Sequence, residues 1–208
     1  MISEKKIPTR IIIIEDNRFI RSGIEMVLNA EADFKVIGSY SNCEEAFFRN
    51  RISEAELVVM DIKLPGISGV EGVKYLKEHF PQILTIVYSA FEDDVNIFNA
   101  INAGATGFVS KKTTSKELVS ILKAVLNGGS PLTPDLARHI LVFYENHSIK
   151  EFKLNEIEEK VLHSIASGKS YSTIARELTK TEINILRYIR SIYLKVQNNK
   201  NQLTIEGV

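Results

Sequence analysis

The 208-residue sequence is poor in the residues that mark several protein classes. It has one cysteine, Cys43, so it can form neither an internal disulfide nor a thiolate metal site, and we expect Cys43 to be a small buried residue in a protein of the reducing cytoplasm. No apolar run approaches the roughly 18 residues of a membrane-spanning helix, and the start, MISEKKIPTR, lacks the apolar core of a signal peptide. We therefore expect neither secretion nor membrane insertion.

The sequence also lacks net charge, because 26 basic residues balance 26 acidic ones. The balance hides an asymmetry: residues 1–149 carry a net charge of −3 and residues 150–208 a net charge of +3. A uniformly neutral surface would argue against nucleic-acid binding, whereas this division favours two parts with different partners. An ordinary solvated surface accounts equally well for so small an excess.

Five short apolar runs alternate with longer stretches of helical period in the first part of the chain. They are residues 10–14, 34–38, 57–61, 83–89 and 107–111. The runs do not alternate polar with apolar residues, which is typical of parallel strands covered by helices on both faces. Apolar residues three or four apart predict helices over 69–80 and 115–128. The pattern predicts a (βα)5 doubly wound α/β domain with a parallel sheet.

After Gly129 the sequence contains no further strand-like run. Helical patterns cover about 134–144, 155–167, 171–178 and 182–196, and a last turn is expected near 200–206. Ser170 and Thr181 are expected to cap the third and fourth of these helices. We predict an α/β domain at 1–129, a linker helix and tether at 130–153, and a small all-α helix-turn-helix domain at 154–208.

Chemically matched side chains follow the ends of four predicted strands: Glu15, Asp16, Asp61, Ser89 and Lys111. In an open α/β sheet ligands bind at the carboxyl ends of the strands. Three converging carboxylates favour Mg²⁺, and a lysine with a hydroxyl suits a tetrahedral anion. Taken singly, each residue has an ordinary interpretation as a helix cap, a turn residue or a solvated charge. Together they predict a phosphoryl group held between Mg²⁺ and Lys111, with Asp61 able to accept it covalently.

Residues 9–129 resemble the receiver domain of bacterial two-component response regulators. Residues 61–69 read DIKLPGISG and are similar to the D-x-x-[LM]-P-x-x-x-G loop of that family, and residues 104–111, GATGFVSK, resemble its fifth-strand segment. The resemblance implies that a histidine kinase phosphorylates Asp61. It implies phosphoryl chemistry at Asp61, Ser89 and Lys111, a conformational switch at Ser89 and Phe108, and Mg²⁺ binding by Glu15, Asp16, Asp61 and the backbone carbonyl of Lys63.

Residues 154–196 resemble the LuxR-type helix-turn-helix, which makes the whole chain similar to the NarL/FixJ subfamily of response regulators. Residues 154–178 carry the match, LNEIEEKVLHSIASGKSYSTIAREL. The sequence departs from the family at the start of the recognition helix, where the usual Thr-Val-Lys is replaced by residues 184–186, NIL, and the usual His by Tyr188. The predicted DNA contacts are Lys180, Asn184, Arg187, Tyr188, Arg190 and Lys195.

These patterns predict a cytoplasmic response regulator, not an enzyme, whose helix-turn-helix binds double-stranded DNA as a homodimer once Asp61 is phosphorylated. The subfamily implies an inactive state in which the recognition helix packs against the receiver. One alternative is a phosphorylation-dependent adaptor whose divergent helix-turn-helix contacts a protein instead of DNA. A phosphohydrolase using Asp61 as nucleophile is disfavoured, because Lys63 stands where a second acid/base carboxylate is needed.

Overall fold

The computed structural model describes residues 7–49, 51–90, 94–129, 132–146 and 153–198. The strands are β1 (Thr9–Ile14), β2 (Phe34–Tyr40), β3 (Leu57–Met60), β4 (Leu84–Ser89) and β5 (Gly107–Ser110). The helices of the first half are α1 (Arg18–Asn29), α2 (Cys43–Phe48), α3 (Gly69–His79), α4 (Asp94–Ala103) and α5 (Ser115–Leu126). Those of the second half are α6 (Pro134–Asn146), α7 (Glu156–Ala166), α8 (Tyr171–Glu177) and α9 (Glu182–Asn198).

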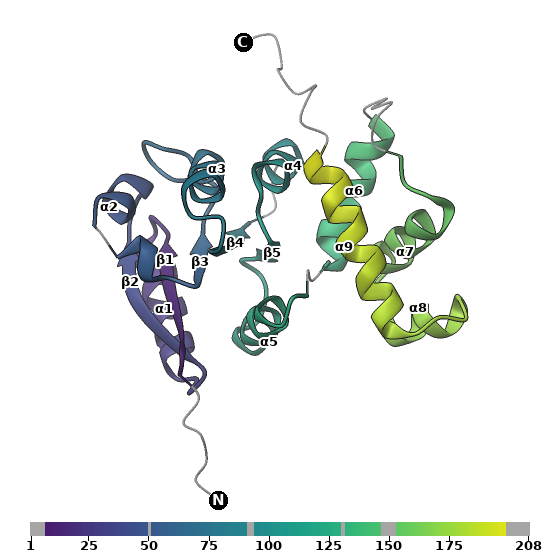
Figure 1. Cartoon of the computed structure of the whole chain (residues 1–208), viewed down its shortest axis with the longest axis horizontal. Helices are drawn as coiled ribbons and strands as arrows, with labels where there is room; N and C mark the ends of the chain where they lie inside the picture. The colour runs from purple at the N-terminus through teal and green to yellow at the C-terminus, as the bar shows by residue number, and fades with distance from the viewer. Residues whose placement is uncertain (1–6, 50, 91–93, 130–131, 147–152, 199–208) are drawn as a thin grey trace, which may run out of the picture.

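The five strands form one parallel sheet in the order β2-β1-β3-β4-β5, with helices on both faces (Figure 1). Successive residues of the central strands enter two separate cores, because side chains alternate between the faces of a sheet. Ile12, Ile14, Val58 and Met60 pack with α2, α3 and α4, whereas Ile11, Ile13, Leu57 and Val59 pack with α1 and α5. The predicted doubly wound α/β fold is confirmed, since both faces are apolar and both are covered.

The strand order places a crevice between β1 and β3, where connections leave the sheet in opposite directions. Tertiary hydrogen bonds fix the chain on both sides of it: the Glu15 amide donates to Tyr40 O at 3.0 Å, and the Asp61 amide donates to Ile14 O at 2.9 Å. At the start of α3 a Cβ on Gly69 would lie 2.0 Å from Asp61 O, so only glycine lets this helix approach the loop so closely. The crevice is therefore rigidly framed.

The second half of the chain is entirely helical over its described residues. Gly168, at φ +84°, follows the end of α7, where a left-handed residue is needed. Ser170 Oγ accepts from Thr173 N at 3.2 Å and Thr181 Oγ1 from Asn184 N at 3.3 Å, which confirms both predicted caps. The turn expected near 200–206 and residues 147–152 of the predicted tether lie outside the described residues.

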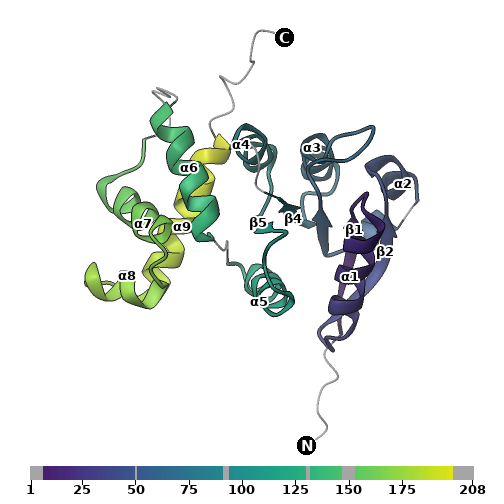
Figure 2. The ribbon, with the colours of Figure 1, turned by 180° about the vertical axis from the view of Figure 1, so that it is seen from behind.

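Helix α6 joins the two halves, because it packs against both α4 and α7. Figures 1 and 2 show α6 and α9 side by side next to α4. Gln197 Nε2 of α9 donates to Ala105 O at 3.0 Å, across the junction. On the other side of α6, Arg138 donates to Ala166 O at 2.6 Å, and the Tyr171 hydroxyl lies 3.1 Å from both Leu132 N and Leu132 O.

Two expectations from composition can be compared with the structure. Cys43 is buried at the first turn of α2 as a free thiol, and burial raises its pKa to about 12. It is thus the small, unreactive core residue that was expected. Within the described residues, no helix combines the length and the apolarity needed to cross a membrane.

Candidate functional site

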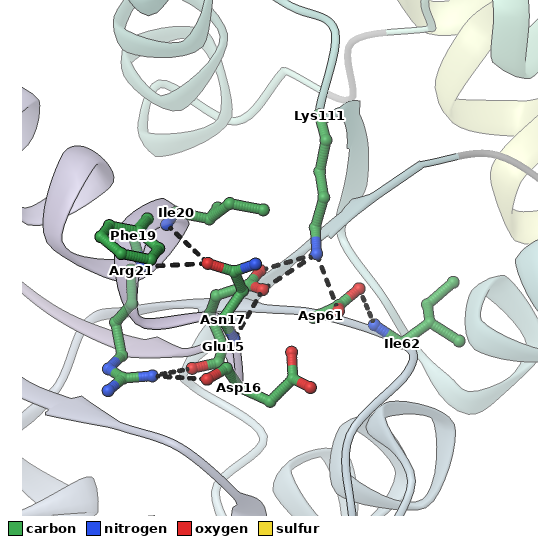
Figure 3. A network of polar contacts seen from close by, with 9 residues as sticks. All are labelled: Glu15, Asp16, Asn17, Phe19, Ile20, Arg21, Asp61, Ile62 and Lys111. Atoms are coloured by element: carbon green, nitrogen blue, oxygen red, sulfur yellow. Dashed lines mark hydrogen bonds and ion pairs between the residues drawn. The ribbon is translucent and has the colours of Figure 1, made fainter.

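The candidate site lies at the carboxyl ends of β1, β3 and β5, where one lysine joins two buried carboxylates (Figure 3). Lys111 Nζ lies 2.8 Å from Asp61 Oδ2 and 2.8 Å from Glu15 Oε2. The Glu15 and Asp61 side chains are only 1% and 5% exposed, and Lys111 only 18%. The structure thus brings together three residues that are up to 96 positions apart in the chain.

Burial dominates the electrostatics of this triad. It raises the pKa of Glu15, and the neighbouring charge of Asp61 acts in the same direction. Burial alone would lower the pKa of Lys111, but its hydrogen bonds to Asp61 and Glu15 outweigh that effect and raise the pKa. Lys111 is therefore a permanent cation at neutral pH, held where negative charge gathers.

Backbone contacts aim the carboxylates. Asp61 Oδ1 accepts from Ile62 N at 2.7 Å, which leaves Oδ2 directed towards Lys111. Glu15 Oε1 accepts from Asn17 N at 3.3 Å, while the Asn17 side chain caps α1. Arg21 donates to the backbone carbonyls of Glu15 and Asp16 and so fixes the acidic pair from below (Figure 3). Sequence reasoning missed Arg21, whose only signal is its place one turn into the helix that follows the acidic pair.

The three carboxylates can share a cation. Glu15, Asp16 and Asp61 each offer an oxygen, and these oxygens lie within 4.8 Å of one another. Asp16 is exposed whereas the other two are buried, so the site is open to solvent on the Asp16 side. A set of hard oxygen donors with solvent access suits Mg²⁺, which keeps several of its waters. The residues present therefore fit the metal expected from the sequence.

A small cavity of about 50 Å³ adjoins Asp61. It is lined by Asp61, Ile62, Lys63, Ser89, Ala90, Asn96, Ile97 and Lys111. Pockets for drug-sized ligands measure about 300–1,000 Å³, so this cavity admits a group of a few atoms and excludes an enclosed organic substrate. Ser89, 6% exposed at the end of β4, faces the cavity as expected.

Phe108 lies in the middle of β5, paired in register with Val87 of β4. Its side chain is 0% exposed and belongs to the core that also contains Phe98 and Ile101 of α4. Phe108 is therefore packed inward, between the sheet and the helix that contacts α6 and α9. Its predicted role as a switch stays a prediction.

The predicted DNA contacts fall into two groups in the structure. Lys180, Arg187 and Arg190 are exposed on or just before α9. Asn184 is half-buried and its Oδ1 accepts from Thr181 N at 3.1 Å, so this side chain completes the helix cap. Tyr188 is also half-buried and packs against the core.

Lys195 makes an internal ion pair. Its Nζ lies 2.5 Å from Oε2 of Glu158, which is 2% exposed, and 2.9 Å from Lys153 O. Although burial works against the charged form, hydrogen bonds from Lys195, Asn155 and Ser191 hold the pKa of Glu158 below its usual value. The charge of Lys195 is thus engaged between α7 and α9, a contact that the sequence alone did not reveal.

Comparison with known proteins agrees with this geometry. Residues 11–123 match the response regulator receiver domain. The chain is 28% identical over 213 residues to the transcriptional regulatory protein LnrK of Bacillus subtilis (strain 168), covering 96% of each chain. It is 25% identical over 192 residues to the response regulator protein VraR of Staphylococcus aureus (strain NCTC 8325 / PS 47), covering 90% of each.

Solved structures share the fold. A structure of the RcsB response regulator of Salmonella typhimurium gives a TM-score of 0.60 at 22% identity, over 91% of this chain and 92% of that one. A structure of the RcsB–DNA complex gives 0.61 at 21% identity, over 95% of this chain and 100% of that one. The family match covers more than half of the 208 residues and contains the whole acidic site. The chain therefore belongs to the response regulator receiver domain family.

Proposed function

We propose that this protein is a response regulator of a two-component system: a histidine kinase phosphorylates Asp61, and phosphorylation controls DNA binding by α8 and α9. The observation that carries the proposal is the Asp61–Lys111–Glu15 triad beside a cavity of about 50 Å³, at the carboxyl edge of the sheet. The names of the relatives, a transcriptional regulatory protein and a response regulator protein, support it.

Asp61 is suited to be the phosphoryl acceptor. A carboxylate oxygen of Asp61 attacks the phosphorus of a phosphohistidine; a P–O bond forms, the P–N bond breaks, and the imidazole nitrogen keeps the electron pair and takes up a proton. Bound by Glu15, Asp16, Asp61 and the carbonyl of Lys63, Mg²⁺ supplies charge neutralisation to the phosphoryl oxygens. Lys111 pairs with one of these oxygens, and Ser89 donates a hydrogen bond to another. The protein accepts a phosphoryl group and turns over no separate substrate, so we infer that it is not an enzyme.

The route from the site to the helical half runs through α4. Ser89 and Phe108 lie on the two strands nearest this helix, and α4 contacts both α6 and α9. Phosphorylation adds a charge of about −1.5 to −2 beside Ser89. We infer that Ser89 and Phe108 then rearrange, that the α4 contacts weaken, and that α9 is released from the receiver. A modification shifts such an equilibrium only by its difference in free energy between the two states.

The helical half is the proposed DNA-binding domain of the NarL/FixJ type, at 154–208, joined by a linker at 130–153 to the receiver at 1–129. Exposed Lys180, Arg187 and Arg190 supply its positive face. Solved structures of RcsB are described as DNA complexes, one of them with two dimers on two DNAs, which supports DNA binding by a homodimer of this chain. We place the protein in the cytoplasm, where kinase and DNA are both available.

Selection from a random duplex library tests the proposal. The full chain is incubated with the library in Mg²⁺, with and without acetyl phosphate, and bound duplexes are recovered and sequenced. The account expects one common sequence, enriched by acetyl phosphate for the wild type and not for Asp61→Asn. Absence of any enriched sequence, from folded protein shown to carry phosphate, would exclude the DNA-binding half of the proposal.

A further inference from the structure

The exposed face of α9 is mostly apolar. Ile183 is 63% exposed, Leu186 41% and Leu194 47%. At 100° per residue these three positions share one face with Arg187 and Arg190, both exposed. The opposite face is formed by Ile185, Ile189, Ile192 and Val196, all 0% exposed. The helix thus has enough apolar residues for its core and three more that the fold does not bury.

The two ends of this face have different surroundings. Arg190 and Leu194 line a cavity of about 270 Å³ together with Lys77 and Thr85 of the receiver half, so the C-terminal part of the face is turned to the receiver. Ile183 and Leu186 lie in the first two turns, ahead of that cavity. The Thr181–Asn184 cap holds these turns in place, through hydrogen bonds of 3.1 Å and 3.3 Å. An ordered, exposed apolar pair therefore stands at the beginning of the helix.

Resting on the proposed function, we propose that Ile183 and Leu186 read thymine by contact with its 5-methyl group. The first residues of a recognition helix are those that reach base edges in the major groove. There, the methyl group of thymine is the apolar feature, while all other base-edge groups are hydrogen-bond donors or acceptors. Two branched aliphatic side chains have no polar group to offer those donors and acceptors, so thymine is the base that they fit.

Spacing and charge support the same assignment. Ile183 and Leu186 are three residues apart, which is about 4.5 Å along the helix axis, close to the roughly 3.4 Å between successive base pairs. The pair can therefore contact thymines at neighbouring positions. Arg187 follows Leu186 directly and Arg190 lies one turn later, where guanidinium groups can bind guanine or phosphate. This charge pattern favours DNA over an apolar protein groove as the partner of the face.

Uracil substitution tests the proposal without changing the protein. Each thymine of the duplex recovered by library selection is replaced singly by uracil, which removes one methyl group and leaves base pairing intact. The phosphorylated full chain should bind about fourfold more weakly when uracil replaces a contacted thymine, the change expected for one buried methyl group. The sensitive positions should be one thymine or two at adjacent base pairs, and uracil elsewhere should have no effect.

Variants identify the side chains. Leu186→Ala and Ile183→Ala should each bind the thymine duplex more weakly and should each abolish the uracil effect at one position. Leu194→Ala, an exposed leucine of the same helix face, is the matched control and should keep the full uracil effect. A circular dichroism spectrum equal to that of the wild type confirms that each variant is folded.

The outcomes separate this inference from the proposed function. If a duplex is recovered but wild-type protein binds its thymine and uracil forms equally at every position, the thymine contact is refuted while DNA binding stands. A uracil effect that persists in both Ile183→Ala and Leu186→Ala refutes it as well, since another residue then reads the methyl group. If the library gives no enriched sequence, both proposals fail together.

Discussion

Replacing Lys111 by methionine removes the cation of the acidic site and keeps most of the side-chain volume. In the wild type this cation lies 2.8 Å from oxygens of both Asp61 and Glu15. After the substitution two buried carboxylates face each other without a counter-charge. We predict that Lys111→Met destabilises the receiver half in the absence of Mg²⁺, and that Mg²⁺ restores much of the loss.

The magnitude follows from burial. All three side chains are less than one-fifth exposed, so the pair belongs with buried ion pairs, for which removal of one partner costs about 3–5 kcal/mol. Protonation of Glu15, whose pKa is already raised by burial, relieves part of the repulsion, so we expect the lower end, about 3 kcal/mol. The pKa of Lys111 lies above its usual 10.5, so its contribution is complete at neutral pH and is lost only as the pH rises through the folded-state pKa.

Urea unfolding in EDTA and in Mg²⁺ measures the effect, with hydrogen exchange of β1 and β3 amides reporting on the receiver half alone. Mg²⁺ at about 100 times its Kd should return roughly 2.7 kcal/mol to the variant. Lys123→Met is the matched control, because Lys123 forms an exposed ion pair with Glu31 and should cause a much smaller loss. A loss below about 1 kcal/mol for Lys111→Met in EDTA would refute the reasoning.

Three further predictions concern other contacts. Arg190→Ala should weaken binding to the selected duplex and lower the slope of log affinity against log salt by about 0.9, as for one lost phosphate contact; an unchanged slope removes Arg190 from the interface. Lys195→Met should destabilise the protein by about 2 kcal/mol in urea unfolding at neutral pH, because Glu158 is left buried without its partner. The pKa of Glu158 is held below 4.5, so this contribution is complete above pH 4.5 and is lost as the pH falls through the folded-state pKa; a deficit that grows in acid contradicts the assignment. Asp16→Asn should weaken Mg²⁺ binding, measured by calorimetry, by roughly tenfold or more, and unchanged affinity excludes Asp16 as a ligand.

The fold could be predicted because its signals are local. A run such as residues 11–14, four isoleucines, is buried on both faces and needs helices above and below it. The ends of α8 and α9 follow from Ser170 and Thr181, whose hydroxyls accept from amides three residues later. The receiver pocket was equally accessible, since a parallel sheet brings its strand ends to one edge whatever their distance in the chain.

Contacts between distant segments had no such signal. Lys195 looks like a DNA contact because it is a cation on the recognition helix, whereas the structure pairs it with Glu158, 37 residues earlier. The dual packing of α6 against α4 and α7 is a tertiary arrangement that an amphipathic stripe leaves open. Arg21 was missed for the same reason: its guanidinium acts on backbone carbonyls, which every sequence contains.

The most direct test of the account is the site of phosphorylation. Full-length protein is incubated with acetyl phosphate and Mg²⁺, and the intact mass is measured before and after hydroxylamine, which cleaves acyl phosphates. The account predicts the mass gain of one phosphoryl group for the wild type, its removal by hydroxylamine, and no gain for Asp61→Asn or in EDTA. Labelling of Asp61→Asn at the same yield as the wild type would contradict it.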